Sequence, residues 1–482
     1  MSGAGGSAAR AVPATAVPGT SPPDAQAAKR APSPTTLRLL NDPIGPTILR
    51  LAAPNAIALT VQTSVSIAET WFVGALGTDS LAGFALVFPF VAMLQMLSAG
   101  AVGGGINAAV ARALGAGDRA RAEALALHAT VIGIGMGIAV GLLMLLFGRT
   151  IFTALGGRGA ALEQACIYAN VVFLGAAAAC LSNSLASVFR GSGNMIVPSL
   201  TLVGVAALQI PLSGALTLGW GPFPRLGIAG TGYAYVVAFA FGAVAQVVLL
   251  LRSRGTVRLL LRLDSLRAAL FADILRVGAL ASLSPVQTVL TVILTTGIVG
   301  GFGTAAIAGY GIGARLELMQ IPIIFGIGTA LVATVGANIG AGQVERAKRA
   351  AWTGALAAAV IVGTIGAVVA VAPRLWLDLF TADPAVIAAG SAYLRTVGPC
   401  YFFFALGVAL YFASQGAGHV LWPVVGGTVR LAVAAGGGWT LVHLWGGGVE
   451  NAFLALSVAM ALFGAVTAAA VALTSWAPRR RG

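Results

Sequence analysis

The chain has 482 residues, of which 58% are hydrophobic and only 9% are charged, and its mean hydropathy is +0.94. A soluble globular protein has about 25% charged residues, so this composition excludes a soluble enzyme and predicts a polytopic, all-α membrane protein. The net charge of +14 would suggest a nucleic-acid partner in a soluble chain, but here the basic residues fall in short loops, where membrane topology explains them.

The first 45 residues are rich in Ala, Pro, Ser and Gly and show no hydrophobic periodicity. This composition predicts a disordered cytoplasmic tail over residues 1–45. A signal peptide is not expected, because no apolar core of the required length precedes Leu37.

Twelve apolar segments follow the tail, and most are long enough to cross a hydrocarbon core of about 30 Å. Their approximate bounds are 47–72, 81–111, 123–147, 162–189, 194–218, 228–251, 272–299, 305–338, 350–371, 386–413, 420–442 and 450–474. Prolines inside several of them predict kinked or partly broken helices. The chain then ends in a short basic tail, residues 476–482.

The distribution of basic residues predicts the orientation. If the N-terminus is inside, the outer loops hold only Arg149, Arg158, Arg225 and Arg374, and most other basic residues lie on the inner side. By the positive-inside rule, both termini are expected to be cytoplasmic, in a multi-pass protein of the inner (plasma) membrane.

The central loop, residues 252–271, is basic throughout. On a helix, Arg254, Arg258 and Arg262 would share one face and several leucines another. This pattern is typical of an amphipathic helix lying on the lipid surface. A plain basic linker is an equally good interpretation.

Sequence landmarks recur at a nearly constant offset. LGAGDRARA at 114–122 matches IGAGQVERA at 339–347, and Gly191, Gly193 and Pro198 match Gly416, Gly418 and Pro423. GTDSLAG at 77–83 also matches GTAAIAG at 303–309. Six spans separate equivalent positions, so we predict two homologous six-helix halves in the same orientation, residues 46–251 and 272–475, with the substrate route between them.

The first span carries a polar stripe that ends in a carboxylate. Asn55, Gln62 and Glu69 are seven residues apart in turn, and Ser66 lies three residues before Glu69, so all four share one helical face. A carboxylate at mid-membrane costs roughly 2.5–3.5 kcal/mol, so such a residue usually faces a cavity or a partner helix. The stripe predicts a coupling or substrate site; a structurally paired carboxylate is the alternative.

Other polar residues lie inside the spans. Glu317 and Gln320 are three residues apart and share a face, which fits either a structural ion pair involving Arg315 or a position in the substrate cleft. Gln287 fits either a hydrogen bond between helices or a cleft position. No cluster of His, Cys and carboxylate residues and no phosphate-binding loop motif occurs, so we expect no enzyme activity, no metal site, no cofactor and no use of ATP.

The chain resembles the multidrug and toxic compound extrusion (MATE) transporters over residues 46–475. Pro54 followed by AETWFVGALGTDSLAG looks like the first-helix signature of that family, and the two repeated loops look like its paired loops. GPFPRLGIAGTG at 221–232 is similar to the DinF-like branch. The resemblance implies two six-helix bundles around a central cleft that export drugs or toxins in exchange for protons or sodium ions.

The resemblance also bears on single residues. The family's first-helix aspartate falls on Glu69. The helix-five polar residues of DinF-like members fall on Ala206 and Ile210, where Gln209 is the only polar neighbour, and a helix-seven glutamate of other branches falls near Gln287. The implied coupling network is thereby reduced to Glu69, which favours protons over sodium.

We therefore expect a monomeric antiporter that exports toxic organic, often cationic, small molecules. The alternative is a flippase of related architecture for lipid-linked precursors or polysaccharides. A flippase of that kind often has a more cationic cleft than the few arginines within these spans suggest.

Overall fold

The computed structural model describes residues 33–253, 257–260 and 266–476, and all regular elements within these residues are helical. The first helix, α1 (Pro34–Asn41), shows that the predicted disorder is wrong for residues 34–45. The Ser33 side chain accepts a hydrogen bond from the Thr36 backbone N–H, and Pro34 occupies the first turn, so α1 has a regular N-cap. Its buried Leu39 and Leu40 pack against Ala337. Residues 1–32 lie outside the described residues.

The N-terminal half contains the expected spans as helices. They are α2 (Ile44–Gly74), α3 (Thr78–Gln95), α4 (Gly103–Gly115), α5 (Arg119–Ala154), α6 (Gly159–Leu174), α7 (Ala176–Gly191), α8 (Ile196–Leu218) and α9 (Ile228–Arg252). A π-helical segment, Met96–Val102, joins α3 to α4. The second expected span is therefore one continuous path with a local change of helical pitch.

The C-terminal half repeats this organisation. Its helices are α10 (Ala268–Ala281), α11 (Leu283–Gly300), α12 (Thr304–Gly340), α13 (Val344–Val371), α14 (Arg374–Leu377), α15 (Pro384–Val397), α16 (Tyr401–Ala417), α17 (Leu421–Ala432) and α18 (Val449–Leu473). Two π-helical segments, Val433–Gly437 and Thr440–Leu444, extend α17.

Each of the twelve expected spans has a helical counterpart among the described residues. Ten helices or continuous pairs are long and apolar enough to cross a membrane, and α6 with α7, bent by 47° at Gly175, makes an eleventh. The twelfth expected span is α17 with its π-helical extension. The protein is thus a multi-pass, all-α membrane protein. Pro54 and Pro211 lie inside unbroken helices, so proline alone did not indicate where the spans break.

The central linker does not form the expected amphipathic helix where it is described. Residues 257–260 have no regular secondary structure, and the Leu259 N–H donates to the Leu250 carbonyl. Val257 and Leu259 are buried while Arg258 between them is exposed. This alternation has the period of an extended chain rather than of a helix. Residues 254–256 and 261–265, and with them Arg254 and Arg262, lie outside the described residues.

The backbone confirms the predicted repeat at its turns. Gly117 and Gly342 have φ of 74° and 77°, and Gly193 and Gly418 have φ of 78° and 79°. Both pairs lie in the left-handed region, which glycine adopts without a steric penalty. The two halves therefore close equivalent loops with the same local conformation.

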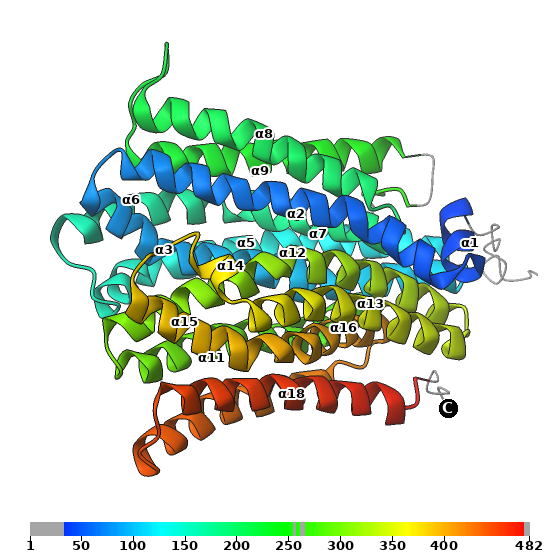
Figure 1. Ribbon diagram of the computed structural model, residues 1–482. Helices are drawn as coiled ribbons and strands as arrows, with labels where there is room; N and C mark the ends of the chain where they lie inside the picture. The colour runs from blue at the N-terminus through cyan, green and yellow to red at the C-terminus, as the bar shows by residue number, and fades with distance from the viewer. Residues whose placement is uncertain (1–32, 254–256, 261–265, 477–482) are drawn as a thin grey trace, which may run out of the picture.

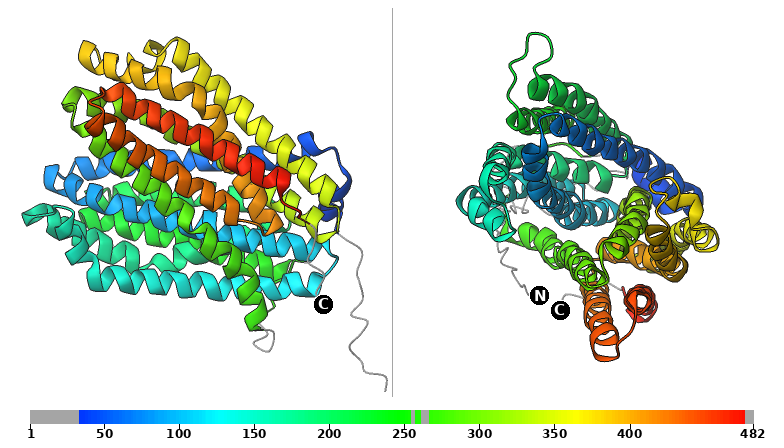
Figure 2. Two further views of the ribbon diagram at one scale, coloured as in Figure 1. Left: turned by 90° about the horizontal axis from the view of Figure 1, so that it is seen from below. Right: turned by 60° about the vertical axis from the view of Figure 1, so that its left-hand side comes forward.

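The helices run side by side, and their ends gather at two ends of the molecule. Figure 1 shows that α1, the end of α18 and the end of α9 lie at one end, which we call the basic end because the loops rich in arginine lie there. The turn between α2 and α3 lies at the opposite end. In the right-hand view of Figure 2, the N-terminal half (blue to green) and the C-terminal half (yellow-green to red) form two groups of helices.

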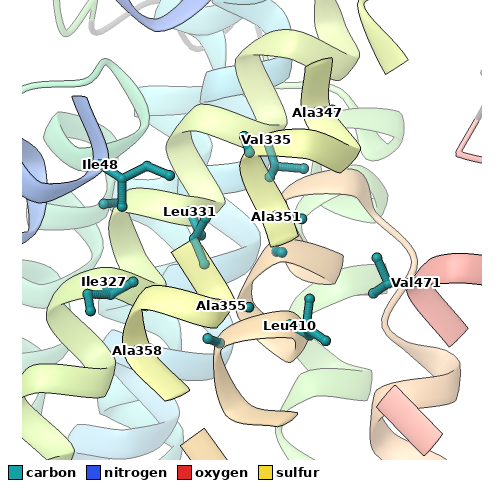
Figure 3. Close-up of a cluster of buried hydrophobic side chains, with 14 of the residues drawn as sticks. Ile48, Ile327, Leu331, Val335, Ala347, Ala351, Ala355, Ala358, Leu410 and Val471 are labelled. Atoms are coloured by element: carbon teal, nitrogen blue, oxygen red, sulfur yellow. The ribbon is translucent and has the colours of Figure 1, made fainter. Parts of the chain in front are cut away.

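Small residues allow the helices to approach closely. In Figure 3, one face of α13 presents Ala347, Ala351, Ala355 and Ala358, all fully buried, toward residues such as Leu331 of α12. Small side chains of this kind are typical of helix interfaces in a bilayer, because packing rather than the hydrophobic effect holds the helices together.

The two halves meet through α4 and α12 near the basic end. A Cβ at Gly115 would lie 2.0 Å from the Ala337 carbonyl oxygen, and one at Gly340 would lie 2.1 Å from the Arg112 carbonyl oxygen. The repeat relates Gly115 to Gly340 and Arg112 to Ala337, so the contact is close to twofold symmetric. Glycine is required at both positions because the two backbones touch there.

Candidate functional site

Glu69 is buried inside the N-terminal half, with 6% of its surface exposed. The Gln209 side chain, from α8, donates a hydrogen bond of 2.7 Å from Nε2 to Glu69 Oε1. No described basic side chain forms an ion pair with Glu69 within 4 Å. Glu69 is therefore a carboxylate held by one amide in apolar surroundings, a setting that disfavours its charged form and suits proton binding or the capture of a cation.

Two tyrosines complete the surroundings of Glu69. Tyr168 of α6 and Tyr235 of α9 lie close enough for the Glu69 charge to act on their hydroxyl groups. The buried oxygens Tyr235 Oη, Ser213 Oγ and Gln209 Oε1 have no hydrogen-bond partner among the described residues. Gln209 was among the predicted site residues, but the two tyrosines and Ser213 were not, although a tyrosine within an apolar span is a signal for a buried polar site.

The polar stripe of α2 does not form a single site. Asn55 donates from Nδ2 to Thr329 Oγ1 of α12 at 3.0 Å, and so belongs to the contact between the halves. Gln62 and Ser66 are half-buried, and Gln62 Oε1 has no partner. Of the predicted site residues, only Gln209 is joined to Glu69 by a hydrogen bond.

The remaining candidates lie in the C-terminal half. The Tyr393 hydroxyl donates to Glu317 Oε2 at 3.3 Å, and the charge of Glu317 interacts with that of Arg430. Gln320 is buried, and its Nε2 has no partner among the described residues. Arg315 lies 6.0 Å from the centre of the Phe380 ring, and no described carboxylate pairs with it. Arg315 therefore forms no ion pair among the described residues, whereas Glu317 has a basic neighbour on another helix, Arg430.

A cavity of about 80 Å³ is lined by α11, α12, α16, α17 and α18 of the same half and by the π-helical segment Met96–Val102 of the N-terminal half, so it lies where the two halves meet. Gln287 and Arg430 lie on its wall. Gln287 Nε2 donates to Thr428 Oγ1 at 2.8 Å and to the Val424 carbonyl at 3.3 Å. Gln287 thus forms the expected hydrogen bonds between helices and also faces the cavity, and its position in a substrate cleft stays a prediction.

Polar contacts close the basic end between the halves. Asp273 of α10 pairs with Arg112 at 2.9 Å and with Arg121 at 2.8 Å, and Arg112 also donates to the Gly416 carbonyl at 3.2 Å. Further from the basic end, Asn55 on α2 donates to Thr329 on α12, and the Gln415 side chain donates to the Gly100 carbonyl at 3.4 Å. The polar contacts between the two halves are therefore concentrated toward the basic end of the molecule.

Comparisons with known proteins agree with this architecture. The MatE family model matches residues 54–214 and again 282–438, once in each half. A FAD transporter from Shewanella oneidensis is 26% identical over 377 residues, which cover 78% of this chain and 82% of that protein. A probable multidrug resistance protein NorM from Burkholderia mallei is 29% identical, over 74% of this chain and 75% of its own.

Solved structures are also similar. A MOP superfamily transporter from Pyrococcus furiosus, described as having a binding pocket of reverse polarity, superposes with a TM-score of 0.84 at 25% identity, over 92% of this chain and 100% of that one. An outward-facing MATE transporter gives a TM-score of 0.82 at 25% identity, over 91% of this chain and 97% of its own. The two matches to the family model, one in each half, show that this chain belongs to the MatE family of membrane transporters.

Proposed function

We propose that this protein is a secondary active antiporter that exports drugs or other toxic organic compounds, often cationic, in exchange for protons. Curated relatives named as multidrug resistance or multidrug export proteins, such as NorM from Thermotoga maritima and MepA from Staphylococcus aureus, support the substrate class. The observation that carries the proposal is the burial of Glu69 with Gln209 as its one hydrogen-bond donor and no basic partner.

Burial of this carboxylate links protons to substrate. The charged form loses hydration on burial, so Glu69 gains from either a proton or an organic cation beside it. When a proton binds, the negative charge that holds a cation is lost, and the cation is released. A proton and a cationic substrate therefore compete for the same carboxylate, which is the requirement for exchange.

The two halves supply the conformational change. In the conformation of this structure, the ion pairs of Asp273 with Arg112 and Arg121 hold the two halves together at the basic end. We place the basic end in the cytoplasm by the positive-inside rule. Glu69 would then exchange ligands on the outer side in this state and on the inner side once these pairs break, with its occupancy biasing the equilibrium between the two.

Sodium is less favoured as the coupling ion. Hard cations bind to several oxygen ligands at once. Beside Gln209 on α8, the side chains of Ala206 and Ile210 offer no oxygen. The remaining oxygens near Glu69 belong to an amide and to neutral hydroxyl groups, so the single carboxylate suits a proton better than a metal ion.

The test uses purified protein in liposomes, with export of ethidium followed under an imposed pH gradient or an imposed sodium gradient. We expect export with the pH gradient and little with sodium when pH is equal on both sides. Export driven by sodium alone would contradict proton coupling. Movement of a labelled lipid-linked precursor, with no export of ethidium, would favour the flippase alternative.

A further inference from the structure

Arg430 of α17 is a buried cation for which neither the sequence nor the proposed exchange at Glu69 provides a role. Only 7% of its surface is exposed, and it lies in the expected span over residues 420–442, where burying an arginine is costly. Its guanidinium lies 5.1 Å from the centre of the Phe404 ring and 5.7 Å from that of Phe463. These contacts hold the guanidinium by cation–π attraction and leave its N–H groups free to donate.

The guanidinium has no polar partner of its own. No described residue accepts a hydrogen bond from it or pairs with it within 4 Å. Glu317 is near enough for the two charges to interact, but its carboxylate accepts from Tyr393 instead. A planar group with five donors, buried and unpaired, lacks a planar acceptor such as a carboxylate.

The cavity beside Arg430 can hold such an acceptor. Its wall is largely aromatic and aliphatic, with Phe325, Phe404 and Phe463 among the lining residues. Gln287 reaches the wall because Gly427 is a glycine: a Cβ at this position would lie 2.3 Å from Gln287 Oε1. At about 80 Å³, the cavity limits the enclosed part of a ligand to a small group.

We propose that this cavity is a second ligand site, which binds the acid group of small aromatic acids through Arg430. The fork of the guanidinium matches the two oxygens of a carboxylate, and the aromatic walls receive the ring. The site goes beyond the cationic compounds proposed for Glu69, and it depends on the proposed function only for the step from binding to export.

Glu317 sets the strength of this site. Its negative charge offsets part of the field of Arg430, so it competes with an acidic ligand for the same cation. Removing the charge of Glu317 should therefore strengthen acid binding, whereas removing the charge of Arg430 should abolish it. A cavity that accepted aromatic compounds by shape alone would respond to neither change.

The test measures binding of radiolabelled salicylate to the purified, full-length protein, with competition by unlabelled salicylate and by salicylamide. The two compounds have nearly the same size and differ in charge. We expect salicylate to compete at least tenfold better than salicylamide. Arg430→Gln should remove this preference, Arg430→Lys should keep part of it, and Glu317→Gln should strengthen salicylate binding about threefold or more. Arg315→Gln, which removes a similar charge outside the cavity, is the control and should bind as the wild type does.

Equal competition by salicylate and salicylamide in the wild-type protein would overturn the proposal, and this measurement needs no variant to fold. An equal loss of preference in Arg315→Gln and Arg430→Gln would also overturn it, because the effect would then be one of net charge. The result is independent of coupling: binding without gradient-driven export would contradict the proposed function alone.

Discussion

The two halves share their turns but differ in the charged residues that lie inside their spans. The repeat that relates Gly77 to Gly303 places Thr295 at the position of Glu69, and Thr295 is buried with its hydroxyl unpartnered. The repeat that relates Pro198 to Pro423 places Val205 at the position of Arg430, and Val205 is also buried. The N-terminal half thus holds an unpaired carboxylate, and the C-terminal half holds a guanidinium that faces a cavity.

This difference shows which features the duplication kept. Turns that need a left-handed glycine, and backbones that touch at Gly115 and Gly340, are constrained by packing, so both copies retain them. A buried charge does not stabilise the fold unless it has a ligand or a partner. Packing therefore did not require the two halves to keep the same charged residue at equivalent positions. We infer that the two halves share their packing and move as a pair, but that each half contains a different binding site.

The largest expected effect comes from removing the N-terminal carboxylate. Glu69→Gln keeps the size of the side chain but fixes it as neutral, so gradient-driven ethidium export should fall at least tenfold. Glu69→Asp should keep part of the activity, because it retains the carboxylate with a shorter reach. The measurement is export from liposomes that contain equal amounts of folded protein.

The matched control for Glu69 is its repeat equivalent. Thr295→Val removes a buried polar atom in the other half and should leave export within about twofold of wild type. If Glu69→Gln pumps at the wild-type rate, the carboxylate is a structural residue and the contrast between the halves has no role in coupling.

The second effect concerns the shared packing. Gly340→Ala would place a Cβ 2.1 Å from the Arg112 carbonyl oxygen, so the halves must separate. Overpacking of this kind typically costs about 1–3 kcal/mol, and thermal unfolding in detergent should show the loss. Gly135→Ala, in a helix where a Cβ meets nothing within 4 Å, is the control and should not destabilise the protein. Equal stability of the two variants would contradict the close contact between α4 and α12.

Much of the fold could be predicted from hydropathy and the repeat. Twelve apolar segments and duplicated glycines are local features of the chain, and both reappear as helices and turns. The start of α1 was missed because the Ser33–Pro34 capping signal lies next to a tail of low complexity. The sequence left the linker open between an amphipathic helix and a plain basic segment, because a short run of alternating residues fits both a helical and an extended period.

The sites were less accessible to sequence reasoning. Glu69 could be identified because one carboxylate in an apolar span is rare and costly. Its partner Gln209 and its neighbours Tyr168 and Tyr235 come from three other helices, so their proximity depends on packing that no local pattern encodes. Arg430 could not be identified as a site residue, because the sequence does not show whether an arginine within an expected span reaches the surface or a cavity.

The third effect concerns the closed basic end. Asp273→Asn removes the charge that pairs with Arg112 and Arg121, so conformations open at this end should become more populated. We expect a thiol reagent to label Ser414→Cys, a buried position near this contact, about fivefold faster in the Asp273→Asn background. Glu163→Gln breaks an exposed ion pair within the N-terminal half and is the control. Similar acceleration by both changes would show that Asp273 does not fasten the halves.

The smallest expected effect is at the hydrogen bond between Asn55 and Thr329. Asn55 Nδ2 donates to Thr329 Oγ1 across the two halves, away from the ion pairs of the basic end. Hydrogen bonds between membrane helices average about 0.6 kcal/mol in double-mutant cycles. A cycle of Asn55→Ala and Thr329→Val, read by thermal unfolding, should give a coupling energy of this size.

This small coupling energy should still have a measurable effect on the equilibrium between the two conformations. Because the bond joins the halves only while they are closed at the basic end, each single variant should shift the equilibrium slightly toward opening there, in the same direction as Asp273→Asn and by less. Labelling of Ser414→Cys should therefore rise by no more than about threefold, since 0.6 kcal/mol corresponds to that ratio of populations. A shift in the opposite direction would mean that Asn55 and Thr329 also stay paired when the basic end opens. The pivot between the halves would then lie at this level rather than beyond it.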